Sequence, residues 1–147
     1  MSAKFQIVID CKDPVRMCAF WASALGYEPE PPPAGFASWY DYWRDLGLPQ
    51  SEQQPTPDRL MDPTGRGPPI WFQVVDEAKA VKNRVHFDLA ASGGRTIPLA
   101  VRKERVDAEA ARLVLLGARW VEAYSEEGVD HYAVAMRDPE DNEFDIN

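Results

Sequence analysis

The order of predicted elements, which occurs twice along the chain, is the feature that most constrains the fold. Each half reads as a strand, a helix that ends in Leu-Gly, two further strands, a turn that contains Asp-Pro, and a last strand. The matching dipeptides are Leu25-Gly26 with Leu116-Gly117, and Asp62-Pro63 with Asp138-Pro139. We therefore predict an α+β fold made of two β-α-β-β-β modules, at about residues 4–76 and 84–147.

Each module opens on a run that alternates polar and apolar residues, the pattern of a strand with one apolar face. The predicted apolar faces are Phe5, Ile7 and Ile9 in the first run, and Val85, Phe87 and Leu89 in the run 84–89. The opposite, polar faces carry Gln6 and Asp10 in the first run, His86 and Asp88 in the second, and Glu143 and Asp145 in the last strand. We expect these polar faces to line one cleft formed by a paired, eight-stranded sheet.

One amphipathic helix is predicted in each module. The first begins at Pro14, after the capping residue Asp13, and ends at Gly26. The second runs from about residue 101 to 116, and its apolar face is predicted to be Val106, Ala110, Leu113 and either Val114 or Leu116. The other strands are expected at residues 27–29, 59–61, 70–75, 118–124, 131–137 and 143–146.

Residues 36–57 form an insertion in the first module that is unusually rich in aromatic side chains. A short helix with Ser38 as its cap is predicted there, followed by a polar loop. Two interpretations remain open. The aromatic residues could pack the insertion onto the sheet. Alternatively, Trp39 and Trp43, together with Trp71 of the following strand, could form the wall of a ligand site.

Length and charge limit the class of protein. A chain of 147 residues suits one domain with one core, and we expect a single domain over residues 1–147. The formal net charge of −8 argues against nucleic acid or an anionic membrane as the partner. The sequence contains no apolar stretch long enough for a signal peptide or a membrane span, so we expect a cytoplasmic protein. Cys11 and Cys18 fit no metal or redox spacing and are predicted to be buried thiols.

Three segments together resemble the vicinal oxygen chelate superfamily, and more narrowly its glyoxalase-like domain proteins. They are the opening run 5–14, the helix run 20–26 and the closing run 138–144. The superfamily includes glyoxalase I, extradiol dioxygenases and the bleomycin and fosfomycin resistance proteins. The resemblance covers nearly the whole chain, and it implies a glyoxalase/bleomycin resistance fold and a pairing of modules that favours a homodimer.

The resemblance also implies where a metal would bind. The family's ligand positions correspond to Gln6, Gln73, His86 and Asp145, of which Gln6, His86 and Asp145 are the candidate metal ligands. Enzymes of the family usually carry glutamate where Asp145 stands. A site with one imidazole and one carboxylate would suit Zn²⁺, Ni²⁺, Mn²⁺ or Fe²⁺, although two neutral glutamines would make the binding weak.

Two hypotheses about function follow. In the first, the protein is a metal-free binder of a small molecule, and its acidic cleft and the three tryptophans suit a flat cation. The residues predicted to bind this ligand are Gln6, Asp10, Trp39, Trp43, Trp71, Gln73, His86 and Asp88. In the second, the protein is a metal-dependent lyase, isomerase or dioxygenase that acts on vicinal oxygens, and Glu143 or Asp145 moves a proton.

Overall fold

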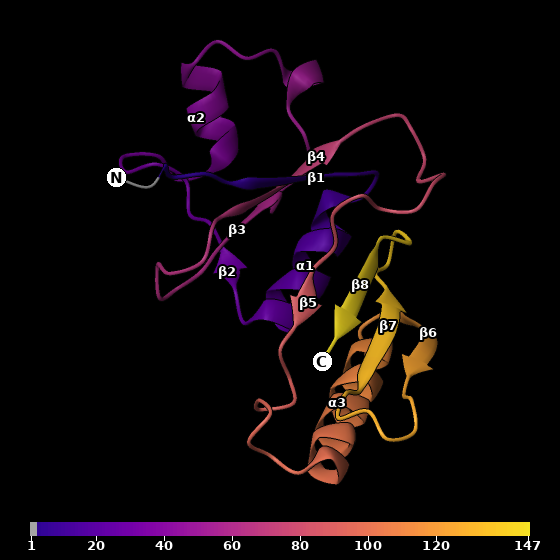
Figure 1. Cartoon of the computed structure of the whole chain (residues 1–147). Coiled ribbons are helices and arrows are strands. Elements are labelled where there is room, and N and C mark those ends of the chain that lie inside the picture. The colour runs from indigo at the N-terminus through magenta and orange to yellow at the C-terminus, as the bar shows by residue number, and fades with distance from the viewer. Residues whose placement is uncertain (1–2) are drawn as a thin grey trace. The chain divides into compact units, whose positions relative to one another are not determined.

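The computed structural model describes residues 3–147, which form two compact units, one up to Ala78 and the other from Lys79 to Asn147 (Figure 1). Within the described residues, each unit contains one four-stranded sheet. None of the helices in this part of the chain is long and apolar enough to cross a membrane. Both units have the predicted element order, so the prediction of an α+β fold with two β-α-β-β-β modules is confirmed.

The first unit contains β1 (Ile7–Cys11), α1 (Pro14–Leu25), β2 (Glu28–Pro29), α2 (Trp39–Asp45), η1 (Gln50–Glu52), β3 (Arg59–Met61) and β4 (Ile70–Val74). Its strands lie in the order β1-β4-β3-β2, with β1 parallel to β4 and the other pairs antiparallel. The first strand of the module is therefore paired with its last strand.

The second unit contains β5 (Asp88–Leu89), α3 (Leu99–Leu115), β6 (Arg119–Tyr124), β7 (Ala133–Arg137) and β8 (Glu143–Ile146). The strand order is β5-β8-β7-β6, and β5 is parallel to β8. This is the topology of the first unit, which is the result expected for a duplicated module.

Local sequence signals determine where α1 begins and ends. The Oδ1 atom of Asp13 accepts a hydrogen bond from the backbone N–H of Arg16 at 3.0 Å, and Pro14 occupies the first turn. At the other end Gly26 adopts a φ of 68°, which glycine tolerates without strain, and its N–H bonds to the carbonyl of Ala22. Between these caps, the helix buries one apolar face against β3 and β4.

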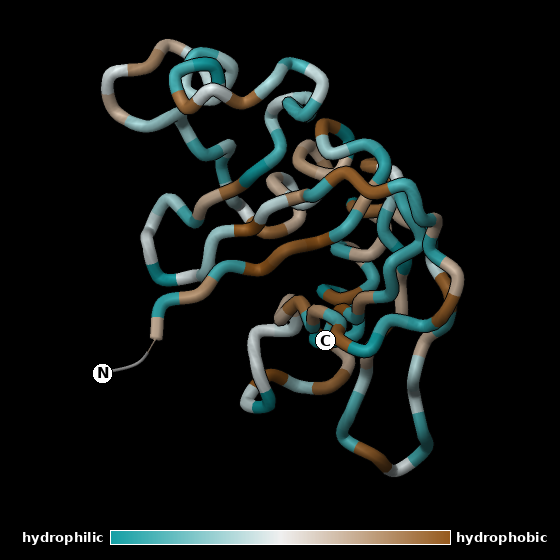
Figure 2. Tube along the Cα trace, turned by 90° about the horizontal axis from the view of Figure 1, so that it is seen from above, coloured by the Kyte–Doolittle hydropathy of each residue, from teal (hydrophilic) through white to brown (hydrophobic). Residues whose placement is uncertain are grey.

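The sheet of the first unit has one more buried and one more accessible face, because burial alternates along β1 and β4. Figure 2 shows the start of β1 as a continuous hydrophobic stretch. Ile70 and Phe72 of β4 are buried, while Trp71 and Gln73 point to the other face. The prediction for Phe5 was wrong: this side chain is 68% exposed, because the ladder with β4 begins only at Ile7. Cys11 and Cys18 are buried free thiols, as predicted, and burial raises the pKa of Cys18 to about 12.

The core of the second unit lies between α3 and its sheet. The fully buried side chains are Val106, Ala110 and Leu113 from α3, Val134 and Met136 from β7, and Phe144 and Ile146 from β8. Val114 and Leu116 were predicted as alternatives for this face, but both are exposed. The buried face of α3 extends instead towards the N-terminus of the helix, one turn before Val106, to Arg102. Arg102 donates a hydrogen bond to the carbonyl of Ile97 at 2.9 Å and forms an ion pair with Asp130.

The run 84–89 is a strand only at Asp88 and Leu89, so the predicted longer strand was wrong. Asp88 pairs with Asp145 in parallel, and extending this register would set Val85 opposite Asn142, in the turn before β8 begins. A ladder partner is therefore lacking, and Val85 is 77% exposed instead of lying on an apolar face.

Candidate metal and ligand site

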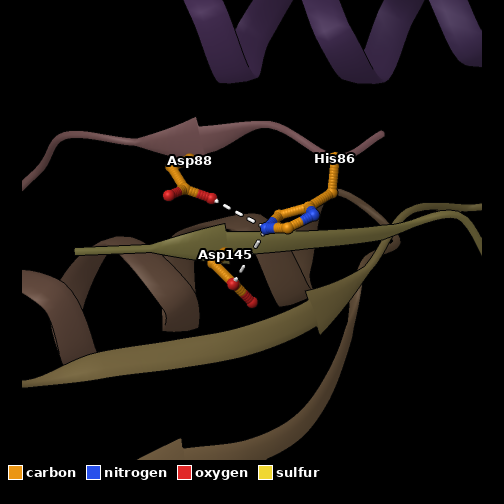
Figure 3. A group of neighbouring side chains, drawn as sticks. All are labelled: His86, Asp88 and Asp145. Atoms are coloured by element: carbon orange, nitrogen blue, oxygen red, sulfur yellow. Dashed lines mark ion pairs between the residues drawn. The ribbon is translucent and has the colours of Figure 1, made fainter. Parts of the chain in front are cut away.

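One histidine and two aspartates of the second unit come together beside the β5–β8 pair. The Nε2 atom of His86 lies 3.2 Å from Oδ1 of Asp88 and 3.5 Å from Oδ2 of Asp145. Figure 3 shows the two carboxylates on different sides of this ring nitrogen, with Asp88 on β5 and Asp145 on β8. All three side chains are partly accessible, so a small solute can reach them. We call these three residues the His-Asp cluster.

The register of the parallel pair explains why the cluster forms. Asp88 and Asp145 are direct partners, so their side chains lie next to each other on one face of the sheet. The N–H of Asp145 donates to the carbonyl of Phe87 at 2.8 Å, which holds this register. Phe144 and Ile146 point into the core, and the alternation along β8 therefore turns Asp145 outwards.

Electrostatics make the cluster a place where a cation would be stabilised. Burial raises the pKa of Asp145, and the neighbouring carboxylate of Asp88 raises it further, while His86 and Lys82 act in the opposite direction. Two carboxylates in contact with one imidazole therefore carry uncompensated negative charge whenever both are ionised. A divalent ion would remove this repulsion.

The spacing of the donor atoms fits one ion. Three donors, each about 2.1 Å from a metal, lie about 3.0–3.4 Å apart in octahedral or tetrahedral geometry. Two of the distances in the cluster are 3.2 Å and 3.5 Å, and all three donor atoms lie within 4.8 Å of one another. One imidazole nitrogen and two carboxylate oxygens also suit Mn²⁺, Fe²⁺, Ni²⁺ or Zn²⁺.

Glu143, the other predicted proton carrier, lies on the same face as Asp145 but is engaged by other groups. Its Oε2 accepts from the backbone N–H of Asn83 and lies 3.0 Å from Nζ of Lys79. Burial alone would raise the pKa of Glu143, but these two partners outweigh it and lower the pKa to about 2. A carboxylate held in this way is a weak proton acceptor at neutral pH, so Asp145 is better suited to that role.

Sequence reasoning missed two side chains that share this face. Arg137 of β7 is the direct partner of Glu143, and Tyr124 of β6 donates its hydroxyl to Glu122 at 2.8 Å. Ala135 of β7 pairs with Glu122 of β6 and with Asp145 of β8, so Glu122, Ala135 and Asp145 form one row across the sheet. The alternation along β6 and β7 predicts on which face of the sheet Tyr124 and Arg137 lie. Which of them is close to the His-Asp cluster depends on the pairing of β6 with β7 and of β7 with β8.

The predicted ligand residues of the first unit occupy its more accessible sheet face. Asp10 and Gln73 are direct partners in the β1–β4 ladder, and both point away from the core. Gln6 is exposed and precedes β1. The residues that do come together as a cluster of metal-ligand type, His86, Asp88 and Asp145, all belong to the second unit.

The three tryptophans that were predicted as a ligand wall surround an arginine of the chain itself. The guanidinium carbon of Arg59 lies 4.2 Å from the ring centre of Trp39, 5.6 Å from that of Trp71 and 6.0 Å from that of Trp43. These distances are typical of cation–π contacts. The aromatic surface therefore already holds a cation, and a cationic ligand would first have to displace Arg59.

Arg59 is fixed in turn by Asp58, a fully buried residue. Nε and Nη2 of Arg59 each lie 3.1 Å from a carboxylate oxygen of Asp58, and Nε1 of Trp71 donates to the same carboxylate at 3.1 Å. Gln54 of the insertion donates to Asp58 and to the carbonyl of Phe72. These contacts bind the insertion to the sheet, which favours the packing interpretation of its aromatic residues.

Comparison with known proteins identifies the fold. A family model described as "Glyoxalase-like domain" matches residues 6–147. A glyoxalase/bleomycin resistance protein/dioxygenase family enzyme from Burkholderia phytofirmans PsJN has a TM-score of 0.59 and 18% identity, covering 97% of this chain and 94% of that one. Fosfomycin resistance protein FosX from Listeria monocytogenes has a TM-score of 0.59 and 13% identity, covering 99% and 92%.

A mutant of the Listeria protein has been solved in complex with Mn(II) and 1S,2S-dihydroxypropylphosphonic acid. It has a TM-score of 0.58 and 14% identity, and the match covers 100% of this chain and 90% of that one. No curated protein matches the chain significantly. At these identities the structural likeness establishes the fold alone.

Proposed function

Because the chain belongs to the glyoxalase-like domain family of the vicinal oxygen chelate superfamily, we propose that it holds a small molecule through a divalent cation bound at the His-Asp cluster. The observation that carries the proposal is the convergence of one imidazole nitrogen and two carboxylate oxygens at the spacing of ligands to one ion. Asp88 matters here, since it adds a second anion to the weak ligand set that the sequence predicted.

The expected ligand is a small molecule with two neighbouring oxygens. Three protein donors leave positions open on a five- or six-coordinate ion, and two adjacent oxygens of one molecule can occupy them. The complex of the Listeria protein contains Mn(II) and a molecule with two neighbouring hydroxyl groups, which supports this class. When bound, the ion would polarise the ligand's oxygens, and His86, Asp88 and Asp145 would hold the ion.

We favour this proposal over a metal-free site for aromatic cations. Trp39, Trp43 and Trp71 stack around Arg59, whose guanidinium is held by two hydrogen bonds to Asp58. Displacing it would leave a buried carboxylate without its counter-ion. A flat cation would therefore gain little from this surface.

Calorimetric titration of chelator-treated protein with Mn²⁺, Ni²⁺ and Zn²⁺ tests the proposal. We expect one site per chain, and a loss of affinity of at least about tenfold in His86→Ala and in Asp145→Asn. His131→Ala is the matched control, since His131 is the other histidine of the chain and is not part of the cluster. Binding that is equally strong in His86→Ala, or no binding at all, would refute the proposal.

A further inference from the structure

Arg137 places a positive charge next to the His-Asp cluster, on the same face of the sheet. Val134 and Met136 of β7 point into the core, so the alternation along the strand turns Ala135 and Arg137 to the face that carries Asp145. Arg137 is the direct partner of Glu143, as Ala135 is of Asp145. The guanidinium group and the cluster therefore belong to one surface.

The guanidinium of Arg137 is poorly satisfied by the protein. Its Nε atom is buried and has no hydrogen-bond partner among residues 3–147. The acid facing it, Glu143, lies 3.6 Å from Nη2, which is longer than a hydrogen bond. Glu143 is already held by Lys79 and by the N–H of Asn83, both at 3.0 Å. The Arg137 side chain is 34% exposed, so an anion from outside the chain could reach the accessible part of the guanidinium and would be bound favourably there.

A second arginine faces Arg137 across the sheet but is paired with an aspartate. Arg119 of β6 is the direct partner of Arg137 on the other side of β7. Like charges that face each other across two strands destabilise a sheet. Arg119 turns to Asp141, with which it forms an ion pair, and this leaves Arg137 to interact with whatever lies over the sheet. Arg137 is therefore the arginine of this pair that is left to stabilise an anion.

The distance to the cluster suits a small ligand with two functional ends. Arg137 and Glu143 stand two residues along their strands from Ala135 and Asp145, which corresponds to about 7 Å. Ala135 lies between Asp145 of the cluster and Glu122 of β6, and its methyl side chain occupies little space above the sheet. A molecule of four to six heavy atoms could therefore reach from the cluster to the guanidinium.

We propose that Arg137 binds an anionic group, a carboxylate or a phosphate, at one end of the small molecule whose oxygens meet the cation at the His-Asp cluster. This inference rests on the proposed function for the second half of the ligand, but the anion site itself requires no metal. The net charge of −8 repels anions at long range, so the selectivity must come from local contacts with the guanidinium.

The test uses metal-free, chelator-treated protein and two probes, inorganic phosphate and acetate. NMR spectra of the arginine Nε–H groups should show a saturable shift of the Arg137 signal with at least one probe. The stronger probe then identifies the anionic group as phosphate-like or as a carboxylate. Arg137→Gln should weaken the saturable backbone shifts of β7 at least tenfold. Arg119→Gln, the matched control on the facing strand, should retain them within about threefold, because Arg119 is paired with Asp141.

Arg137→Lys covers the case in which the glutamine variant does not fold. It keeps the charge but lacks the forked donor, so the affinity for phosphate should fall while the protein stays folded. Unchanged affinity in both Arg137 variants, or no saturable shift with either probe in the wild type, would overturn the inference. A failure of anion binding in a protein that still binds Mn²⁺ contradicts only the role of Arg137. The opposite result contradicts only the cation site.

Discussion

Asp58→Asn is the substitution for which the structure makes the sharpest prediction about stability. Asp58 is fully buried, and its carboxylate accepts two hydrogen bonds from Arg59, one from the indole of Trp71 and one from the side-chain amide of Gln54. Asparagine has almost the same shape but no charge, and its NH₂ group would face donors in place of an acceptor. The substitution therefore removes the counter-ion of Arg59 without creating a cavity.

The size of the effect follows from the burial of the pair. Removing one partner of a fully buried ion pair costs about 3–5 kcal/mol. The side chain of Arg59 is 23% exposed, so water can replace part of the lost interaction, and we expect a cost of about 2–3 kcal/mol. With a denaturant dependence of about 2 kcal/mol per molar urea, the midpoint of unfolding should fall by about 1–1.5 M.

Urea unfolding followed by tryptophan fluorescence is the appropriate assay, because Trp39, Trp43 and Trp71 surround Arg59. The control is Asp41→Asn, which also removes the carboxylate partner of an arginine. The side chain of that arginine, Arg44, is 76% exposed, and we expect its midpoint to stay close to that of the wild type. Equal midpoints for Asp58→Asn and the wild type would refute the view that this buried pair binds the insertion to the sheet.

Two further predictions concern pH and assembly. Hydrogen bonds from the N–H of Gly67 and from Thr64 lower the pKa of Asp62 to about 2, below its unfolded value of about 3.8. The stabilisation by Asp62 is therefore complete above pH 3.8 and lost as the pH falls towards 2. Asp62→Asn should flatten this part of the curve of melting temperature against pH, and an unchanged slope would contradict the assignment. The family resemblance predicts a homodimer, and sedimentation equilibrium showing a monomer at tens of micromolar would exclude it.

The alternation of polar and apolar residues was enough to predict that certain polar side chains of the second unit lie on the outward faces of their strands. His86 and Asp88 were assigned to one face from the sequence, and Asp145 to the outward face of the last strand, and the structure brings the three side chains together. For Asp88 and Asp145 this works because side chains alternate along a strand. His86 precedes β5 and is not part of a strand, so the alternation rule does not account for its position. The family model and the solved structures confirm the recognition of the superfamily.

What could not be predicted depends on contacts between segments far apart in the sequence. Arg59 was recognised as part of a strand, but its role between three tryptophans requires both the β3–β4 pairing and the fold of the insertion. Arg137 could be placed on a face, but its position opposite Glu143 depends on the register of β7 and β8. The exposure of Val85 has the same cause, since alternation predicts a face but not where a ladder begins.

The parallel pairing of the first strand of each module with its last strand has a consequence for biosynthesis. During translation β1 cannot pair until β4 has been synthesised, and β5 cannot pair until β8 has been synthesised, because within residues 3–147 each has its only partner strand in the last strand of its module. The first module can therefore fold while the second is still being synthesised. Asp145 lies on the last strand of the second module, so a nascent chain acquires the complete His-Asp cluster only when β8 has left the ribosome and joined β5.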